Sequence, residues 1–108
     1  MEDVLRVDIS HLNGTTFVTV TGELDANSTL ALQAPLCELS LERHILVDMA
    51  GVGFIDSSGL KVLLAQRIRM SESDGSIHIR NPSEAVRRLI ETTGLTDILL
   101  EPKTLVDD

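Results

Sequence analysis

The first quarter of the chain carries the pattern of two antiparallel strands. Apolar and polar side chains alternate over residues 4–9, which is typical of a strand with one buried face. The dipeptide Asn13-Gly14 favours a hairpin turn, and residues 16–21 are rich in β-branched side chains. We therefore expect a β-hairpin whose second strand ends at Gly22. The apolar face of the first strand comprises Leu5, Val7 and Ile9.

A helix is expected after the hairpin, but one residue disagrees with its pattern. Residues 25–28 offer several N-cap oxygens, and apolar positions continue at helical spacing to about residue 41. Pro35 lies inside this run and lacks a backbone donor. We expect either a kink or a helix that begins closer to Pro35. Cys37, on the same apolar stretch, is expected to be a small core residue.

Short apolar runs and helical patterns alternate in the middle of the chain. Residues 44–49 are nearly all apolar, as in a strand covered on both faces, and residues 50–55 are expected to form a loop. A helix is expected to follow from residues 56–59 to about Met70. Its apolar stripe comprises Leu60, Leu63, Leu64 and Ile68.

The last third predicts a strand, a helix and a short final strand. Residues 76–80 are expected to form the strand. Asn81-Pro82 is typical of a helix start with Asn81 as the N-cap. Gly94 is expected to close that helix as a C-cap glycine, before a strand over residues 97–100.

The order of these elements indicates the fold class. Strands that alternate with helices favour parallel pairings and right-handed crossovers. We expect a single small α/β domain over residues 1–108, with a polar tail from about residue 101. Its sheet is mixed and mostly parallel, with an N-terminal hairpin strand and about three to four helices packed on it.

Composition and charge narrow the possible functions. The chain has 108 residues, with 9 Lys and Arg against 17 Asp and Glu, so its formal net charge is −8. This charge repels nucleic acid and anionic membranes. The single cysteine, the acidic N-terminus and the lack of a long apolar run are typical of a cytoplasmic protein. We expect direct contact with neither nucleic acid nor membrane.

The sequence contains no motif for catalysis or cofactor binding. Residues 59–62 lack the Gly-Lys pair of a P-loop, and residues 51–56 lack the third glycine of a dinucleotide-binding fingerprint. Ser57 and Ser58 lack the elbow of a serine hydrolase. We therefore expect no enzyme activity, metal or cofactor. The candidate metal ligands have no partner at ligand spacing: Cys37, His11, His44 and His78.

The segment Asp56-Ser57-Ser58-Gly59 allows two interpretations. Asp56 or a serine can cap the helix, contributing about 0.5–2 kcal/mol, while Gly59 eases a tight entry. Alternatively, a serine hydroxyl is displayed at the helix N-terminus, where a phosphate would meet the positive end of the helix dipole. That phosphate would add about −1.5 to −2 charges beside Asp56 and repel an acidic partner surface.

Several segments together resemble a known family. They read ILVDM at residues 45–49, FIDSSGL at residues 54–60, TGELD at residues 21–25 and LIETTGL at residues 89–95. At this joint spacing they resemble STAS domains, and above all the small bacterial anti-sigma factor antagonists. The resemblance covers about residues 4–100.

The resemblance implies a partner-switching function. Such a protein binds an anti-sigma factor that is also a serine kinase of the histidine-kinase-like ATPase class, and binding frees a sigma factor. The kinase phosphorylates the serine after the motif aspartate, here Ser57, which releases the antagonist until a PP2C-type phosphatase restores it. The implied partner-binding residues are Glu23, Asp25, Asp56, Ser57, Ser58, Gly59 and Lys61.

Two departures from the family pattern leave alternatives open. Lys61 stands where many antagonists carry glycine, and its cation can pair with an acidic partner or with the added phosphate. Pro35 is unusual in the first helix. One alternative is an unphosphorylated STAS accessory or scaffold module of a transport or stress-signalling assembly, and another is nucleotide binding. An exposed first strand could also pair two copies into a weak homodimer.

Overall fold

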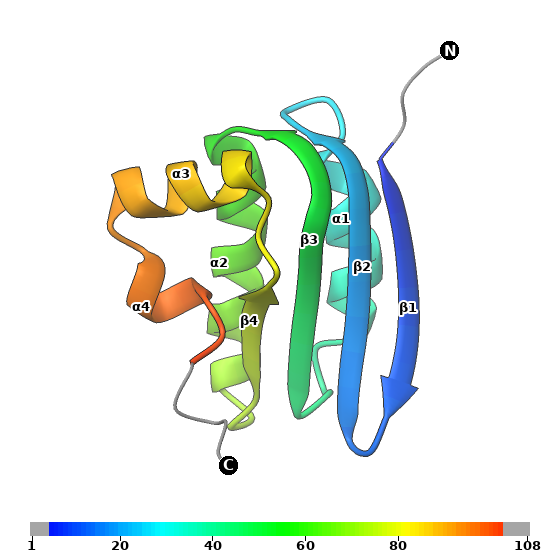
Figure 1. Ribbon diagram of the computed structural model, residues 1–108. Coiled ribbons are helices and arrows are strands. Elements are labelled where there is room, and N and C mark those ends of the chain that lie inside the picture. The colour runs from blue at the N-terminus through cyan, green and yellow to red at the C-terminus, as the bar shows by residue number, and fades with distance from the viewer. Residues whose placement is uncertain (1–4, 103–108) are drawn as a thin grey trace.

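A four-stranded mixed sheet forms the centre of the molecule (Figure 1). The computed structural model describes residues 5–102. The strands lie in the order β1-β2-β3-β4; β1 and β2 are antiparallel, and β2, β3 and β4 run parallel to one another. Their bounds are β1 Arg6–Leu12, β2 Thr15–Leu24, β3 His44–Ile55 and β4 Ser76–Arg80.

Two helices cover one face of the sheet. In Figure 1, α1 and α2 lie behind the strands, whereas α3 packs near the end of β3 and α4 lies beside β4. Among residues 5–102, no helix is both long enough and apolar enough to cross a membrane. The helices are α1 Thr29–Glu38, α2 Ser57–Ser71, α3 Glu84–Thr93 and α4 Thr96–Leu99.

The core lies between the sheet and the helices. Alternate residues of β2 and β3 point into it because successive side chains of a strand face opposite sides. Leu32 and Leu36 of α1 and Leu63 and Met70 of α2 pack from the helical side. The inward residues of the two central strands are Thr16, Val18, Val20, Ile45, Val47 and Met49.

The hairpin is confirmed, but its two strands are longer than expected. β2 continues past Gly22 to Leu24, because Gly22 adopts a φ of 115° and the register against β3 shifts there. β1 pairs with one neighbour only, and its Ile9 is 40% exposed, so the expected apolar face is only partly buried. Val4, the first residue of the predicted strand, lies outside the described residues.

The first helix begins at Thr29, and the prediction of a start near Pro35 is wrong. Pro35 cannot donate to the carbonyl of Ala31, and its ring crowds that carbonyl, but Ala31 is exposed, so water can satisfy the freed oxygen. Cys37 is also exposed, so its predicted place in the core is wrong. Tertiary packing buries the Leu32–Leu36 side of the helix and leaves Cys37 on the other.

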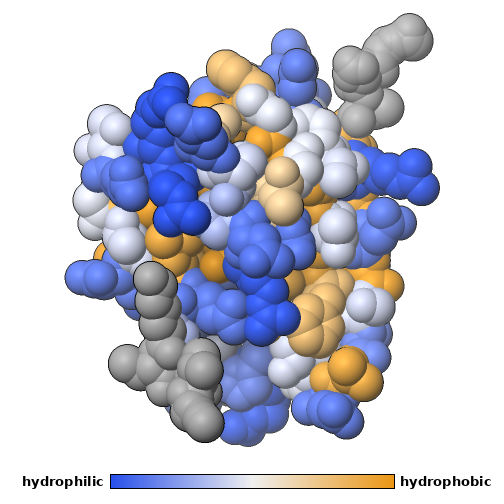
Figure 2. Space-filling model, viewed as in Figure 1, coloured by the Kyte–Doolittle hydropathy of each residue, from blue (hydrophilic) through white to orange (hydrophobic). Residues whose placement is uncertain are grey.

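The predicted loop at residues 50–55 is instead the second half of β3. The expected cover on both faces of this strand is wrong as well. Leu46 and Asp48 are only half-buried, and the face of the molecule seen in Figure 2 carries mixed hydrophilic and hydrophobic surface. The helix over residues 57–71 is confirmed, but Ile68 is 61% exposed and does not belong to its buried stripe.

The last elements differ most from expectation. Ser83, not Asn81, caps α3, because its Oγ accepts a hydrogen bond from the Val86 amide. Gly94 closes α3 with a φ of 75°, as predicted. The expected strand over residues 97–100 is wrong: the short helix α4 replaces it, and only a single bridge joins Leu100 to β4. Most of the predicted polar tail, residues 103–108, lies outside the described residues.

Candidate functional site

The candidate site lies where β2 and β3 end. Glu23 pairs with Phe54 and Leu24 with Ile55 in the parallel register, and the Asp56 amide donates to the Leu24 carbonyl at 3.2 Å. The carboxyl ends of parallel strands are where ligands meet α/β folds. The pairing therefore brings the segments around Glu23 and Asp56, far apart in sequence, to one edge of the sheet.

Asp56 caps α2 and leaves Ser57 free. Its Oδ1 accepts a hydrogen bond from the Ser58 amide at 2.9 Å, and its backbone is extended, with φ −124° and ψ −175°. Ser57 is the first helical residue, is exposed, and its hydroxyl makes no hydrogen bond to any residue between 5 and 102. The capping and display roles that the sequence left open therefore belong to different residues.

Gly59 has a reason to be glycine that differs from the expected one. Its backbone does not need the left-handed region, but a Cβ there would lie 2.7 Å from Leu24 Cδ2. Gly59 is buried, and it lets the first turn of α2 pack directly on the end of β2. Gly59 therefore contributes to the site by packing against β2 and not by contact with a partner.

A network of short hydrogen bonds holds the loop between β2 and α1. Ser28 Oγ donates to the Glu23 carbonyl at 2.7 Å and accepts from the Asp25 amide at 3.0 Å. Asp25 Oδ1 accepts from the Asn27 amide at 2.9 Å. Glu23 is exposed and Asp25 half-buried, and they flank Leu24, whose carbonyl accepts from the Asp56 amide.

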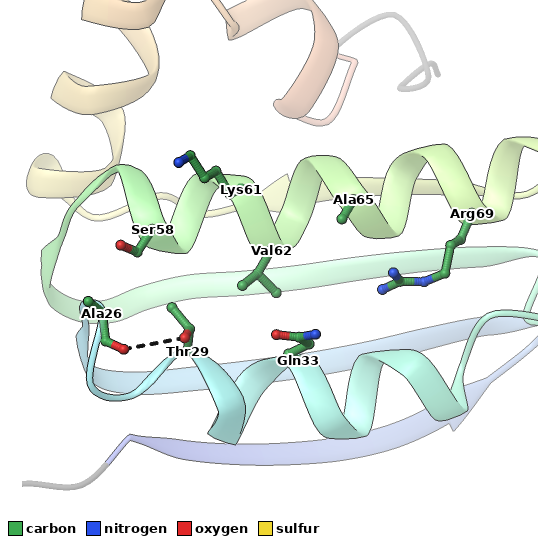
Figure 3. A pocket seen from close by; sticks show the side chains of 8 residues that line it. All are labelled: Ala26, Thr29, Gln33, Ser58, Lys61, Val62, Ala65 and Arg69. Carbon is green, nitrogen blue, oxygen red and sulfur yellow. Dashed lines mark hydrogen bonds between the residues drawn. The ribbon is translucent and has the colours of Figure 1, made fainter.

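Two features of the site were missed by sequence reasoning. Phe54 is 47% exposed and is the register partner of Glu23 on the neighbouring strand; the sequence predicts a loop at this position, where no alternation argument applies. A groove of about 270 Å³ between α1 and α2 also opens beside Ser58 (Figure 3). No local pattern reveals it, because its walls come from helices packed by the tertiary fold.

Lys61 lies one turn after Ser57 on α2. It is exposed and forms no ion pair within residues 5–102. Figure 3 shows its side chain directed away from α1. Residues four apart on a helix are neighbours on its surface, so the amine lies within reach of a group attached to Ser57.

The histidines lie far from this site. His44 begins β3 and pairs in register with Ser76, at the strand end opposite Phe54. Burial, and secondarily the Arg67 charge, lowers the pKa of His78 from its ordinary value. Within the described part of the chain, no cluster of three or more His, Cys, Asp or Glu side chains could hold a metal ion.

Comparison with protein families identifies the chain. The family model described as "Mlab, STAS domain" matches residues 7–102. The chain belongs to the STAS domain family. The resemblance to STAS domains found in the sequence is therefore confirmed.

Two relatives of this STAS domain are named as anti-sigma factor antagonists. The anti-sigma F factor antagonist of Paenibacillus polymyxa is 28% identical over 98 residues, which are 88% of this chain and 84% of the relative. The anti-sigma-B factor antagonist of Staphylococcus epidermidis is 31% identical over 84 residues, 76% of this chain and 78% of the relative. These relatives are named as regulatory proteins and not as enzymes.

Solved structures share the STAS fold found here. The anti-sigma factor antagonist SpoIIAA in its unphosphorylated form has a TM-score of 0.77 at 20% identity, covering 93% of this chain and 91% of that chain. The phosphorylated form of the Bacillus cell fate determinant SpoIIAA has a TM-score of 0.70 at 19% identity, covering 93% and 95%. At this identity the likeness establishes the fold of the domain.

Proposed function

We propose that this STAS domain is an anti-sigma factor antagonist, which binds an anti-sigma factor and so frees a sigma factor. The observation that carries the proposal is the division of roles at the start of α2: Asp56 caps the helix, and the Ser57 hydroxyl is exposed and unbonded within residues 5–102. A modification of Ser57 therefore leaves the fold intact. In this role the protein acts by binding, in the cytoplasm, and catalyses no reaction itself.

Phosphorylation of Ser57 would turn binding off. A phosphate at the first helical position is favoured by the helix dipole, so α2 would tolerate it. It adds about −1.5 to −2 charges with three acceptor oxygens. Glu23 and Asp56 already make this edge acidic, and the added charge would repel an acidic surface of the partner. The partner is then a serine kinase of the histidine-kinase-like ATPase class, and a PP2C-type phosphatase reverses the change.

The docking surface would centre on the exposed edge formed by β2, β3 and α2. Phe54 supplies an aromatic anchor of the kind that dominates binding energy at protein interfaces. Gly59 contributes by positioning the loop, because it is buried. The side chains available for contact are Glu23, Asp25, Phe54, Asp56, Ser57, Ser58 and Lys61.

The test compares binding of wild-type protein, Ser57→Ala and Ser57→Asp to each candidate anti-sigma factor kinase of the source organism by calorimetry. We expect Ser57→Ala to bind like wild type and Ser57→Asp to lose at least about tenfold, since like charges across an interface cost several kcal/mol. Ser73→Asp is the matched control, because Ser73 is an exposed serine in the turn after α2. Equal binding of all variants would refute the switch.

Intact mass after incubation with ATP and the kinase tests the modification itself. We expect one added phosphate, mapped to Ser57, in wild-type protein and none in Ser57→Ala. Tight binding without phosphate transfer would instead indicate a docking module that is not switched at this serine.

A further inference from the structure

The groove between α1 and α2 has an unusual lining for so acidic a chain. It holds about 270 Å³ and lies beside the first turn of α2 (Figure 3). No acidic side chain lines it, although Asp and Glu outnumber Lys and Arg by 17 to 9 in the sequence. The lining residues are Ala26, Thr29, Gln33, Ser58, Lys61, Val62, Ala65 and Arg69.

Arg69 lies at one end of the groove with part of its hydrogen-bonding capacity unused. Its Nη2 donates to Gln66 Oε1 at 2.6 Å, and Gln66 is fully buried. Arg69 Nε is also buried but has no hydrogen-bond partner among residues 5–102. Figure 3 shows the guanidinium between the two helices. Because Nε is shielded from solvent, a ligand in the groove would meet the terminal nitrogens of the guanidinium instead, and this cation forms no ion pair with any residue between 5 and 102.

The rest of the lining indicates what kind of acceptor fits. Thr29, Gln33 and Ser58 add hydroxyl and amide groups, while Val62 and Ala65 provide a short apolar wall. The groove, of about 270 Å³, has room for a carboxylate side chain. Guanidinium groups bind planar carboxylates with two donors at once.

We propose that the α1–α2 groove receives a carboxylate side chain, Asp or Glu, of the protein partner that docks at Ser57. Ser58 lies on the groove and is the neighbour of Ser57 in the first turn of α2, so one partner can contact both. This inference rests on the proposed function for the identity of the partner. The carboxylate ends at the Arg69 guanidinium, and its stem lies against Val62 and Ala65.

Acetate tests the groove without any partner. In an NMR titration of the full chain at constant ionic strength, sodium acetate is compared with sodium chloride and sodium phosphate. We expect acetate to shift the side-chain N–H resonances of the Arg69 guanidinium with a saturable curve, and chloride to have no such effect. A linear drift, or the same drift with chloride, would overturn the proposal. Stronger shifts with phosphate would overturn the assignment to a carboxylate.

Substitutions test the groove in the complex. Arg69→Gln is expected to weaken binding of the kinase by at least about tenfold and to abolish the saturable acetate shift. Arg67→Gln is the matched control: Arg67 is exposed on the same helix but does not line the groove, and we expect a change below about threefold. Arg69→Lys retains the charge but lacks the guanidinium group. We expect its binding to the kinase to fall between that of Arg69→Gln and that of Arg67→Gln. Normal acetate binding by Arg69→Gln would refute the proposal.

The two proposals fail in different ways. If no kinase binds wild-type protein, the proposed function fails, while the acetate titration still decides whether the groove takes a carboxylate. If the kinase binds and Ser57 switches it, but Arg69→Gln binds as wild type does, the groove proposal alone fails.

Discussion

Gly59 lies so close to the Leu24 side chain that any larger residue in its place would force neighbouring atoms to shift. A Cβ on Gly59 would lie 2.7 Å from both Cδ2 and Cγ of Leu24 and 3.1 Å from Ile55 Cγ1. The first turn of α2 therefore rests on the last residues of β2 and β3. Ser57 and Ser58 belong to the same turn of the helix.

Gly59→Ala is expected to destabilise the protein by about 1–3 kcal/mol, because the added methyl group overpacks a fully buried leucine. Urea unfolding followed by circular dichroism measures the change. Gly53→Ala is the matched control, since a Cβ at Gly53 meets no atom within 4 Å, and we expect a change within about 0.5 kcal/mol. Equal stability of the two variants would contradict the close packing.

Removal of the Asp56 cap should weaken the fold without touching the modified hydroxyl. Asp56→Ala leaves the Ser58 amide without its acceptor and is expected to cost about 0.5–2 kcal/mol in the free energy of unfolding. Asp56→Asn keeps a side-chain oxygen and is expected to cost less. Ser57→Ala, at an exposed and unbonded hydroxyl, should stay within about 0.5 kcal/mol of wild type. A larger loss for Ser57→Ala would indicate that Ser57 shares the cap.

A negative charge at position 57 should stabilise α2. We expect Ser57→Asp to gain about 0.3–1 kcal/mol at low salt from the helix dipole. Part of that gain, about 0.2–0.5 kcal/mol, comes from Lys61 four residues later and should disappear in Ser57→Asp with Lys61→Gln. Ser71→Asp, at the C-terminal end of α2, should instead lower the stability, because a negative charge there meets the negative end of the helix dipole. Thermal unfolding at low and high salt provides the measurement, and a gain that resists salt would speak against this electrostatic origin.

The Arg80–Glu101 pair predicts a loss of stability in acid. Nε and Nη2 of Arg80 donate to the two carboxylate oxygens at 2.9 and 2.8 Å, and these bonds lower the pKa of Glu101 from its ordinary 4.5. The folded state therefore favours the carboxylate, so this contribution is complete above pH 4.5 and is lost as the pH falls further. We expect Glu101→Gln to flatten the fall in unfolding free energy below pH 4.5. Parallel wild-type and variant curves in that range would contradict the assignment.

Cys37 should react readily in the native protein. Its side chain is exposed on α1, so a thiol reagent is expected to label it at a rate close to that of denatured protein. Ellman's reagent with and without denaturant gives the comparison. If labelling required denaturant, Cys37 would be buried in the core, as the sequence predicts, and the exposed position would be contradicted.

Most elements of this fold could be predicted from local pattern. The hairpin turn at Asn13-Gly14, the strand at residues 76–80, the α2 helix and the Gly94 cap all depend on backbone preferences of nearby residues. The errors occur where tertiary contacts override those preferences. Residues 50–55 extend along β2 because pairing with β2 outweighs their glycines, and residues 96–99 coil into a helix in spite of their strand-like composition.

The sequence by itself determined the chemistry of the site: an aspartate beside two serines at a helix start, in an acidic chain without catalytic motifs. Helix capping and glycine spacing are local, so they can be read from neighbouring residues. Only the tertiary structure decided that Phe54 is exposed and that Arg69 faces a groove. Those properties depend on parallel strand pairing and helix packing between segments distant in sequence, and no local pattern encodes which side chains such packing leaves exposed.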